Sequence, residues 1–281
     1  MQTNRNIVVT GCSSGIGYCA AKILAEHGYR VIATARKQQD IDRLCDEGLA
    51  CVELELGDSA SVQAAANTMI ELCDGDIYAL INNGAYGQPG AVEDLSRAAL
   101  LEQFECNVFG TQGLTNLILP VMRAKNVGRI VNISSILGLL CLPYRGAYNA
   151  SKYALEALSD TMRMELRGTD IQISLIEPGP IKSNFRPNAL LAFRKHIDVE
   201  KSAHRDLYQS VEARLLDPTP ARFTLPEDAV VKHILHALES RRAKIRYPVT
   251  IPTHILGRAK RWLPDRLMDR ILSKSGGDGT R

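Results

Sequence analysis

The sequence predicts an α/β fold in a single domain, a doubly wound parallel sheet with helices on both faces. Short apolar runs alternate with segments of helical spacing between residues 7 and 249, which is the order of strands and helices in such a sheet. The runs are apolar at successive positions, as in strands covered on both sides. A glycine-rich turn at residues 10–17 joins the first run to the first helical segment. Together these observations favour a Rossmann-type arrangement.

The elements follow one another in this pattern along the first two thirds of the chain. The strand at 7–9 stops at Gly11, and apolar residues then recur at helical spacing over 16–24 until Gly28 ends the helix. Residues 30–35 supply the second strand. Further strands are expected at 51–56, 77–82, 128–134 and 171–177, and helices at about 59–73, 97–124 and 149–167.

The pattern loosens after residue 180. Residues 183–223 are polar and contain three prolines, and we expect them to form a long irregular loop of the kind that carries function. A helix at 226–240 and a strand at 244–249 then complete a domain of residues 1–250. The remaining residues 251–281 predict a tail of two short amphipathic helices, each with an early proline.

Composition excludes several classes of protein. The 281 residues are 45% apolar and 23% charged, which argues against disordered, collagen-like and disulfide-dense chains. The net charge of +3 divides unevenly, because residues 241–281 carry +8 and the preceding 240 carry −5. Such a basic tail suits either an anionic surface or an ordinary solvated helix face. No basic stretch is interleaved with aromatic residues, so nucleic acid is not an expected partner.

The tail also contains the chain's single tryptophan, Trp262. The amphipathic helices around it could cap a pocket or rest on a membrane surface. We expect Trp262 to pack in the core, and membrane contact is the less favoured alternative.

The seven cysteines indicate a reducing compartment. Their number is odd, they form no C-x-x-C motif, and they lie in patterned apolar segments, so we expect small core residues without disulfides. Residues 1–6 lack the apolar stretch of a signal peptide, and no apolar run reaches the roughly 18 residues of a membrane span. A cytoplasmic protein is expected.

The turn Thr10-Gly11-Cys12-Ser13-Ser14-Gly15-Ile16-Gly17 has the chemistry of a phosphate site. Its glycines allow a tight turn and a close approach of backbone N–H groups, and the following helix points its unsatisfied donors at an anion. The same stretch matches G-x-S-x-G with Ser13 as a nucleophile, which would indicate an α/β-hydrolase. Only ten residues precede Gly11, too few for the earlier strands and oxyanion loop of that fold.

A second motif lies in the helix that begins near residue 149. Tyr148 and Lys152 are four residues apart and therefore share a helix face. A nearby ammonium group stabilises a phenolate and moves the pKa of the phenol from about 10 toward neutrality. Ser135 follows the strand at 128–134, so it can face the same crevice at the carboxyl ends of the strands.

These motifs together resemble the short-chain dehydrogenase/reductase superfamily over nearly the whole chain to about residue 250. The marks are the Thr10–Gly17 turn, Asn82-Asn83, Asn107, Ser135, Tyr148, Lys152 and Pro178-Gly179. Within the superfamily, the segment Glu177-Pro178-Gly179-Pro180-Ile181 looks like the 17β-hydroxysteroid and retinol dehydrogenase branch. The segment Arg246-Tyr247-Pro248-Val249-Thr250 looks like the bacterial NADP-dependent aldehyde reductases.

The resemblance implies a role for each of four residues. Tyr148 would be the general acid in reduction and the base in oxidation, and Lys152 would lower the pKa of Tyr148 and bind the nicotinamide ribose. Ser135 would orient the substrate oxygen, and Asn107 would hold a water that connects Lys152 to solvent. Residues 1–250 would then form the catalytic, cofactor-binding domain. No metal is implied, and the six histidines form no H-E-x-x-H motif.

The end of the second strand favours NADP(H) over NAD(H). An acidic residue there would bind the ribose 2′-OH and repel a 2′-phosphate, whereas this chain has Ala35 followed by Arg36 and Lys37. A guanidinium binds a phosphate through two parallel hydrogen bonds. The expected cofactor-binding residues are Gly11, Ser13, Ser14, Gly15, Ile16, Gly17, Arg36, Lys37, Glu55, Leu56, Asn83, Gly84, Tyr148, Lys152, Pro178, Gly179, Ile181 and Ser183.

Two positions depart from the family pattern. Gly84-Ala85 inverts the usual Ala-Gly order, which is expected to alter the backbone path beside the adenine ribose. Glu55 replaces the aspartate that commonly contacts the adenine amine.

The substrate is expected to be an apolar aldehyde, ketone or alcohol. Its lining would come from residues 86–92, 137–145 and 181–216, of which 137–143 are strongly apolar, although the same leucines would equally fit the core. The resemblance also implies a homodimer or homotetramer with contacts through helices 97–124 and 149–167. A non-catalytic NADP(H)-binding regulator is the alternative, and the four filled catalytic positions argue against it.

Overall fold

The computed structural model describes residues 5–276, and within them the predicted α/β fold is confirmed. The sheet has seven parallel strands in the order β3-β2-β1-β4-β5-β6-β7. The strands are β1 (Asn6–Val9), β2 (Arg30–Ala35), β3 (Ala50–Glu53), β4 (Ile77–Asn82), β5 (Val127–Ile133), β6 (Asp170–Glu177) and β7 (Arg246–Pro248). The order reverses between β1 and β4, and the carboxyl ends of these two strands flank the crevice where such sheets bind ligands.

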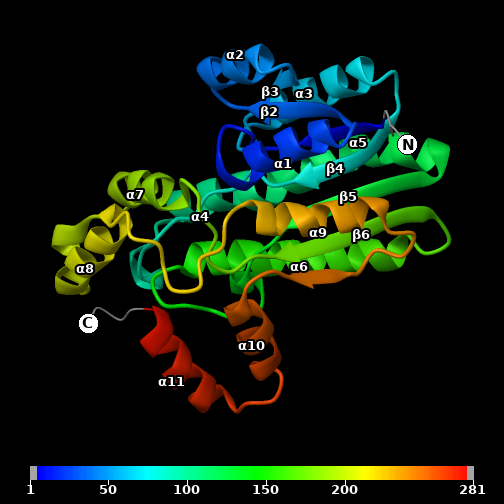
Figure 1. The fold of residues 1–281 in the computed structure, drawn as a ribbon. Coiled ribbons are helices and arrows are strands. Elements are labelled where there is room, and N and C mark those ends of the chain that lie inside the picture. Colours follow the sequence, from blue (N-terminus) through cyan, green and yellow to red (C-terminus); the bar gives the residue numbers. More distant parts are fainter. Residues whose placement is uncertain (1–4, 277–281) are drawn as a thin grey trace.

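Each face of the sheet has its own apolar core, because successive side chains of a strand point to opposite faces. Ile7 and Val9 of β1 face the layer of α1 (Gly15–Glu26), α2 (Gln38–Asp46) and α9 (Asp228–Glu239). Val8, between them, faces the layer of α3 (Ser59–Leu72), α5 (Thr111–Lys125) and the end of α6 (Gly146–Glu165). Figure 1 shows α1 and α9 lying along one side of the strands.

The helix expected at 97–124 is broken into three parts. α4 (Arg97–Phe104) leads into a π-helical segment, η2 (Glu105–Gly110), and then into α5. A Cβ on Gly110 would lie 1.9 Å from the carbonyl oxygen of Leu56, so the backbone of η2 touches the loop after β3. Such π segments frequently mark functional positions, and this one contains Asn107.

The prediction of an irregular loop at 183–223 is wrong for most of that segment. The structure has α7 (Phe185–His196), the short η4 (Val199–Lys201) and α8 (Arg205–Leu216) there. Each helix buries a few apolar side chains at helical spacing among many polar ones, which is why the segment looks polar in sequence. The buried residues are Ala189, Leu190, Ala192 and Phe193 of α7, and Tyr208, Val211 and Leu215 of α8.

The tail forms two helices, as predicted, α10 (Ile251–Ala259) and α11 (Asp265–Gly276), which project from the main body in Figure 1. They pack against the turn η3 (Ile136–Gly138) and the leucines that follow it. The expected core packing of Trp262 is wrong, because its side chain is 86% exposed. Leu263, the next residue, occupies the inward position instead. Residues 277–281 of the predicted tail lie outside the described residues.

The cysteines are only partly the core residues that the sequence predicts. All seven are free, and Cys12 and Cys73 are buried, but Cys45 and Cys141 are exposed. Leu44 takes the inward position of α2, so the adjacent Cys45 faces outward. Among residues 5–276, no helix is both long and apolar enough to span a membrane.

Candidate active site

The turn between β1 and α1 has the shape of an anion cradle. Gly11 and Gly15 adopt positive φ values of 71° and 59°, a region that favours glycine. A Cβ on Gly17 would lie 2.2 Å from the carbonyl oxygen of Gly11, so no side chain fits there. The side chain of Ser14, the residue before α1, does not cap the helix. The backbone N–H groups at this helix terminus can therefore serve a bound anion, which fits a cofactor diphosphate.

Asn83 holds this turn from the neighbouring strand. Its side-chain amide donates to the carbonyl oxygens of Thr10 (2.9 Å) and Gly11 (3.1 Å). The Thr10 hydroxyl in turn accepts hydrogen bonds from the backbone N–H groups of Asn83 and Gly84, both at 2.9 Å. The predicted cofactor residue Asn83 therefore fixes the ends of β1 and β4 against each other.

The inverted Gly84-Ala85 pair has a steric explanation. A Cβ on Gly84 would lie 2.7 Å from Cδ1 of Leu56, and a Cβ on Gly11 would lie 2.8 Å from the Cα of Gly84. The backbones of the two turns thus approach closely beside Leu56. Alanine at position 84, the usual family order, would require the Cδ1 methyl of this leucine to move.

The other cofactor residues predicted after β6 lie around the same turn. A Cβ on Gly15 would lie 3.3 Å from the Cβ of Ser183, so that residue borders the phosphate cradle. A Cβ on Gly179 would lie 2.1 Å from Oγ1 of Thr250, which ties the turn after β6 to the start of the tail. The carbonyl oxygen of Pro178 accepts a hydrogen bond from the N–H of Ile136 at 2.8 Å.

Charged groups surround the carboxyl end of β2. Ala35 is buried, whereas the side chain of Arg36 is 67% exposed and forms an ion pair with Glu55 at 3.3 Å. Lys37 is also exposed and immediately precedes α2. The structure thus places Glu55, expected near an adenine amine, against the arginine expected near a 2′-phosphate.

One residue of this region, Arg43 of α2, was not expected from the sequence. Its guanidinium donates to the carbonyl oxygen of Ser13 at 2.7 Å, and it lies over the ring of Tyr18 at 5.1 Å from the centroid. Arg43 therefore braces the glycine turn from outside. No motif in the sequence indicates this contact, which joins residues 30 positions apart.

Tyr148, Lys152 and Ser135 come together at the carboxyl end of β5. Ser135 precedes η3, and its hydroxyl is hydrogen-bonded with the phenol of Tyr148. Lys152 is buried, donates from Nζ to the carbonyl oxygen of Ile133 at 2.8 Å, and lies 5.7 Å from the centroid of the Tyr148 ring. The three side chains therefore share one site, at the positions where the motifs predict them.

The pKa of Tyr148 differs from the sequence expectation. Burial raises it to about 12, while the hydrogen bond from Ser135 and the positive charge of Arg145 act in the opposite direction. Burial also lowers the pKa of Lys152 to about 8, against the influence of Cys106 and Glu156. The buried ammonium group is directed at a backbone carbonyl, so in this structure it does not bring the phenol toward neutrality.

Asn107 joins the π segment to the helix of the catalytic candidates. Its side-chain oxygen accepts from the N–H of Tyr86 (3.1 Å), and its amide donates to the carbonyl of Tyr86 (2.9 Å) and to the hydroxyl of Ser151 (3.1 Å). Ser151 in turn donates to the carbonyl oxygen of Tyr148 at 2.8 Å. The observed contacts of Asn107 thus position α6 beside the loop after β4.

Apolar groups enclose the phenol of Tyr148. The ring of Phe185, at the start of α7, meets the Tyr148 ring edge-on with centroids 5.2 Å apart. A Cβ on Gly87 would lie 2.6 Å from the Phe185 ring, so the loop after β4 closes the same space. Leu137 and Leu142, with the inner faces of α10 and α11, pack on the other side of Tyr148.

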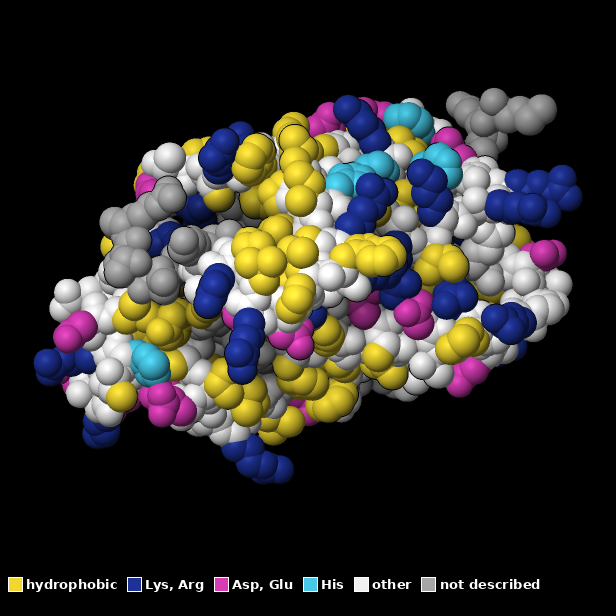
Figure 2. Space-filling model, turned by 90° about the horizontal axis from the view of Figure 1, so that it is seen from below, with side chains coloured by type: hydrophobic (Ala, Val, Ile, Leu, Met, Phe, Trp, Pro, Cys, Tyr) yellow, Lys and Arg dark blue, Asp and Glu magenta, His cyan; other side chains and the backbone are white. Residues whose placement is uncertain are grey.

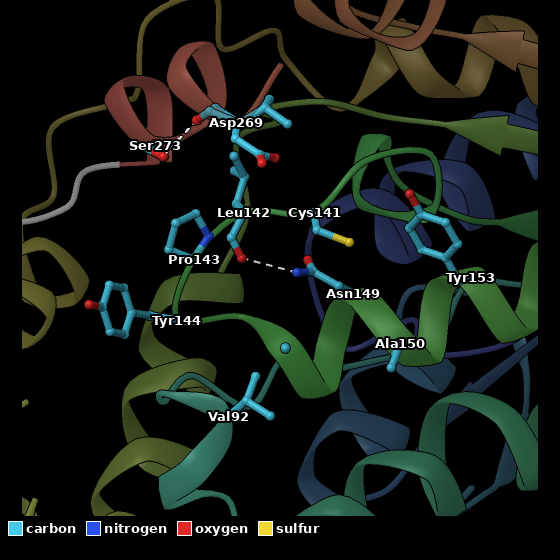
Figure 3. A pocket seen from close by; sticks show the side chains of 12 residues that line it. Val92, Cys141, Leu142, Pro143, Tyr144, Asn149, Ala150, Tyr153, Asp269 and Ser273 are labelled. Atoms are coloured by element: carbon cyan, nitrogen blue, oxygen red, sulfur yellow. Dashed lines mark hydrogen bonds between the residues drawn. The ribbon is translucent and has the colours of Figure 1, made fainter. Parts of the chain in front are cut away.

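A hollow of about 470 Å³ lies between the loop after η3, α6 and α11, but it does not contain the candidate catalytic residues. Its walls include Leu142, Asn149, Tyr153 and Leu272. Figure 3 shows Asn149 directed at Leu142, to whose carbonyl oxygen it donates at 3.0 Å. Leu142 and Leu272 also belong to the apolar cluster that packs on Tyr148, so the hollow adjoins the candidate active site although Ser135, Tyr148 and Lys152 do not line it.

A buried ionic cluster adjoins the site and has no counterpart in the sequence predictions. Arg246 of β7 approaches Glu156 (2.9 Å) and Asp160 (2.6 Å) of α6 and Glu177 of β6 (3.1 Å). Glu156 lies one helical turn after Lys152. Burial and the neighbouring carboxylate of Glu156 raise the pKa of Glu177 to about 7. Three carboxyl groups thus share one guanidinium, which favours retention of a proton among them.

The chain is similar to known proteins over most of its length. The family model described as short chain dehydrogenase matches residues 5–191. The chain is 42% identical to an uncharacterized oxidoreductase, YbbO, from Escherichia coli K12, over 95% of this chain and 94% of that protein. It is 32% identical to human retinol dehydrogenase 8, over 88% and 82% respectively.

Solved structures show the same fold. A short-chain dehydrogenase from Streptomyces avermitilis superposes with a TM-score of 0.76 at 25% identity, covering 96% of this chain and 95% of that one.

Proposed function

Because the chain belongs to the short-chain dehydrogenase family and is an oxidoreductase of that family, we propose that it reduces an apolar aldehyde or ketone with NADPH, or oxidises the corresponding alcohol with NADP⁺. The observation that carries this proposal is the convergence of Tyr148, Ser135 and Lys152 at the carboxyl end of β5. A phenol, a hydroxyl and a buried ammonium within one site suit proton transfer to a carbonyl oxygen.

The residues of the phosphate cradle suit a dinucleotide. The turn from Gly11 to Gly17 would hold the diphosphate, and Lys152 with the segment after Pro178 would border the nicotinamide end. Arg36 and Lys37 would bind the 2′-phosphate of NADP(H), because Ala35 leaves the end of β2 without an acidic group. The nicotinamide ring, when bound, exchanges a hydride with the substrate carbon.

The chain's own residues supply the proton. With a pKa near 12, Tyr148 is protonated at neutral pH, so its hydroxyl can donate to the carbonyl oxygen as charge develops there. Ser135 holds that oxygen through a second hydrogen bond and orients it. The positive charge of Arg145 stabilises the phenolate that remains after donation, and Asn107 keeps α6 in place through Ser151.

An apolar substrate suits the surroundings of Tyr148. Apolar side chains pack around the Tyr148 ring, and they include Phe185, Leu137 and Leu142. The similarity to a protein named retinol dehydrogenase supports a substrate of the same chemical class. We therefore propose long-chain aldehydes, retinal and ketosteroids as the first compounds to examine.

We also propose that the protein self-associates through its long helices. Exposed apolar side chains lie on the surfaces of η2 and α6, where the family resemblance places contacts between copies. They are Phe109, Tyr153, Leu158 and Met164.

The proposed activity is tested by nicotinamide absorbance with NADPH and NADH in parallel against the substrates above. We expect the protein to oxidise NADPH, and Tyr148→Phe to lower kcat by about 10²- to 10⁴-fold, the contribution of a positioned proton donor. Cofactor binding by the variant, followed by titration, serves as the control for folding. Undiminished turnover by Tyr148→Phe would exclude Tyr148 as the proton donor.

A further inference from the structure

The tail helix α10 exposes a stripe of large apolar side chains. Ile251 is 57% exposed, Ile255 is 60% exposed and Trp262 is 86% exposed. Positions 251, 255, 258 and 262 follow helical spacing, so they lie on one side. The turn after α10 continues this geometry to Trp262, because the N–H of Leu263 donates to the carbonyl of Ala259 at 2.8 Å.

The opposite side of α10 is already occupied. Leu256, Ala259 and Leu263 pack against Leu137 and Leu140 beside the active site. Thr253 is buried as well and pairs with Thr250 at 3.0 Å. The helix is therefore fixed on the body of the protein by one face, which leaves the exposed stripe available for a partner.

Basic side chains accompany this stripe. Residues 251–273 contain five Lys/Arg and two acidic residues, Asp265 and Asp269. Seen from below, Figure 2 shows apolar side chains gathered in the middle of this side of the molecule, with Lys and Arg side chains among and around them. The basic residues are Arg258, Lys260, Arg261, Arg266 and Arg270, all exposed. We name Ile251, Ile255, Trp262 and these five residues the tail face.

We propose that the tail face rests on the surface of an anionic lipid bilayer, with Ile251, Ile255 and Trp262 in the headgroup layer. An amphipathic helix with bulky apolar side chains and neighbouring Lys/Arg has the chemistry of such an interface. Tryptophan favours the boundary between water and acyl chains, because its ring is apolar and its N–H is polar. The basic side chains would meet lipid phosphates.

Charge favours a lipid surface over a second copy of the chain as the partner of the tail face. In a twofold contact the same patch meets itself, which would bring the basic residues of two tail faces together. Like charges across an interface oppose association. An anionic surface is attracted by the same groups, so charge complementarity favours lipid. The proposal does not depend on the proposed enzymatic activity, since it concerns residues outside the candidate active site.

Trp262 provides a direct test, because it is the only tryptophan of the chain. In buffer we expect solvent-like emission that acrylamide quenches strongly. Vesicles of equal parts phosphatidylglycerol and phosphatidylcholine should shift this emission to shorter wavelength and reduce the quenching, and the protein should sediment with them. High salt should reverse the binding, and vesicles of phosphatidylcholine alone should have little effect. These vesicle-binding experiments are carried out without substrate or cofactor.

Variants locate the binding surface. The double variant Arg258→Gln/Arg266→Gln should weaken partitioning about tenfold or more, because each basic residue near an anionic surface contributes about fivefold to binding. Ile255→Gln should weaken it as well, whereas Leu72→Gln, an exposed leucine of α3 remote from the tail, should leave it unchanged. Circular dichroism confirms folding of each variant.

Three results would overturn the proposal. One is unchanged Trp262 emission with protein remaining in the supernatant. Another is equal binding to both kinds of vesicle, which would remove the role of charge. The third is Trp262 already shielded from acrylamide without vesicles in an oligomer seen by gel filtration, because the occupant would then be a second copy.

Discussion

At the scale of single residues, Arg36 is proposed to decide the choice of cofactor. Its guanidinium is exposed at the end of β2 and forms an ion pair with the partly exposed carboxylate of Glu55. We expect Arg36→Ala to raise the Kd of NADPH about 10- to 100-fold, the range of charge-assisted hydrogen bonds to a phosphate. The Kd of NADH should change less than about threefold. Fluorescence titration of both cofactors measures this, with Lys37→Ala for comparison; equal losses for the two cofactors would contradict the assignment.

The candidate catalytic residues could be predicted from sequence because their spacing is local. Tyr148 and Lys152 share one helix turn, and Ser135 follows an apolar strand that is easily recognised. Arg43 and Arg246 could not be predicted, because their contacts join segments far apart in the chain. The raised pKa of Tyr148 was also beyond prediction, because it depends on burial and on the direction in which the Lys152 ammonium points.

At the scale of elements, the strands were predictable because each is an apolar run covered on both faces. The helices α7 and α8 could not be predicted, because few of their residues point inward and the residues between them are polar. The π segment η2 was also missed, since one extra residue per turn hardly disturbs helical periodicity over a short stretch. Gly110, at the end of this segment, contacts Leu56 of the loop after β3, and the sequence pattern does not indicate this contact.

The buried ionic cluster that joins α6, β6 and β7 should make the free energy of unfolding depend on pH. The folded state holds a proton on Glu177 with a pKa of about 7, above the ordinary 4.5. The stabilisation that this proton gives the folded state is complete below about pH 4.5 and is lost as the pH rises through 7. Asp160 acts oppositely but at lower pH, because its pKa is lowered by its hydrogen bond with Arg246.

In the unchanged protein the free energy of unfolding should fall between pH 5 and 8. Glu177→Gln should make this fall smaller by about 2 to 3 kcal/mol. Arg246 keeps Glu156 and Asp160 as partners in this variant. Urea unfolding at several pH values measures the effect, and Glu239→Gln, an exposed carboxyl on α9, is the control. A pH profile identical to that of the unchanged protein would show that the retained proton is not on Glu177.

At the scale of the whole molecule, two of the outward surfaces that carry exposed apolar groups differ in character. The tail face combines them with basic residues, as described above. The surface of α6 and η2 presents Phe109, Tyr153, Leu158 and Met164, which are between 38% and 51% exposed. Sequence could place the helices on the outside but not identify these exposed side chains, because exposure depends on the packing of all layers.

This second surface is where copies of the chain are expected to meet. A stable interface buries about 800 Å² on each partner and is centred on bulky apolar residues. We expect gel filtration with light scattering to show a dimer or tetramer at micromolar concentration. The double variant Phe109→Asp/Leu158→Asp should shift it to monomer, since two buried charges in an apolar contact are costly. Ile255→Asp on the tail face should leave the oligomer intact. A monomer without any substitution, or an oligomer lost only with Ile255→Asp, would place the contact elsewhere.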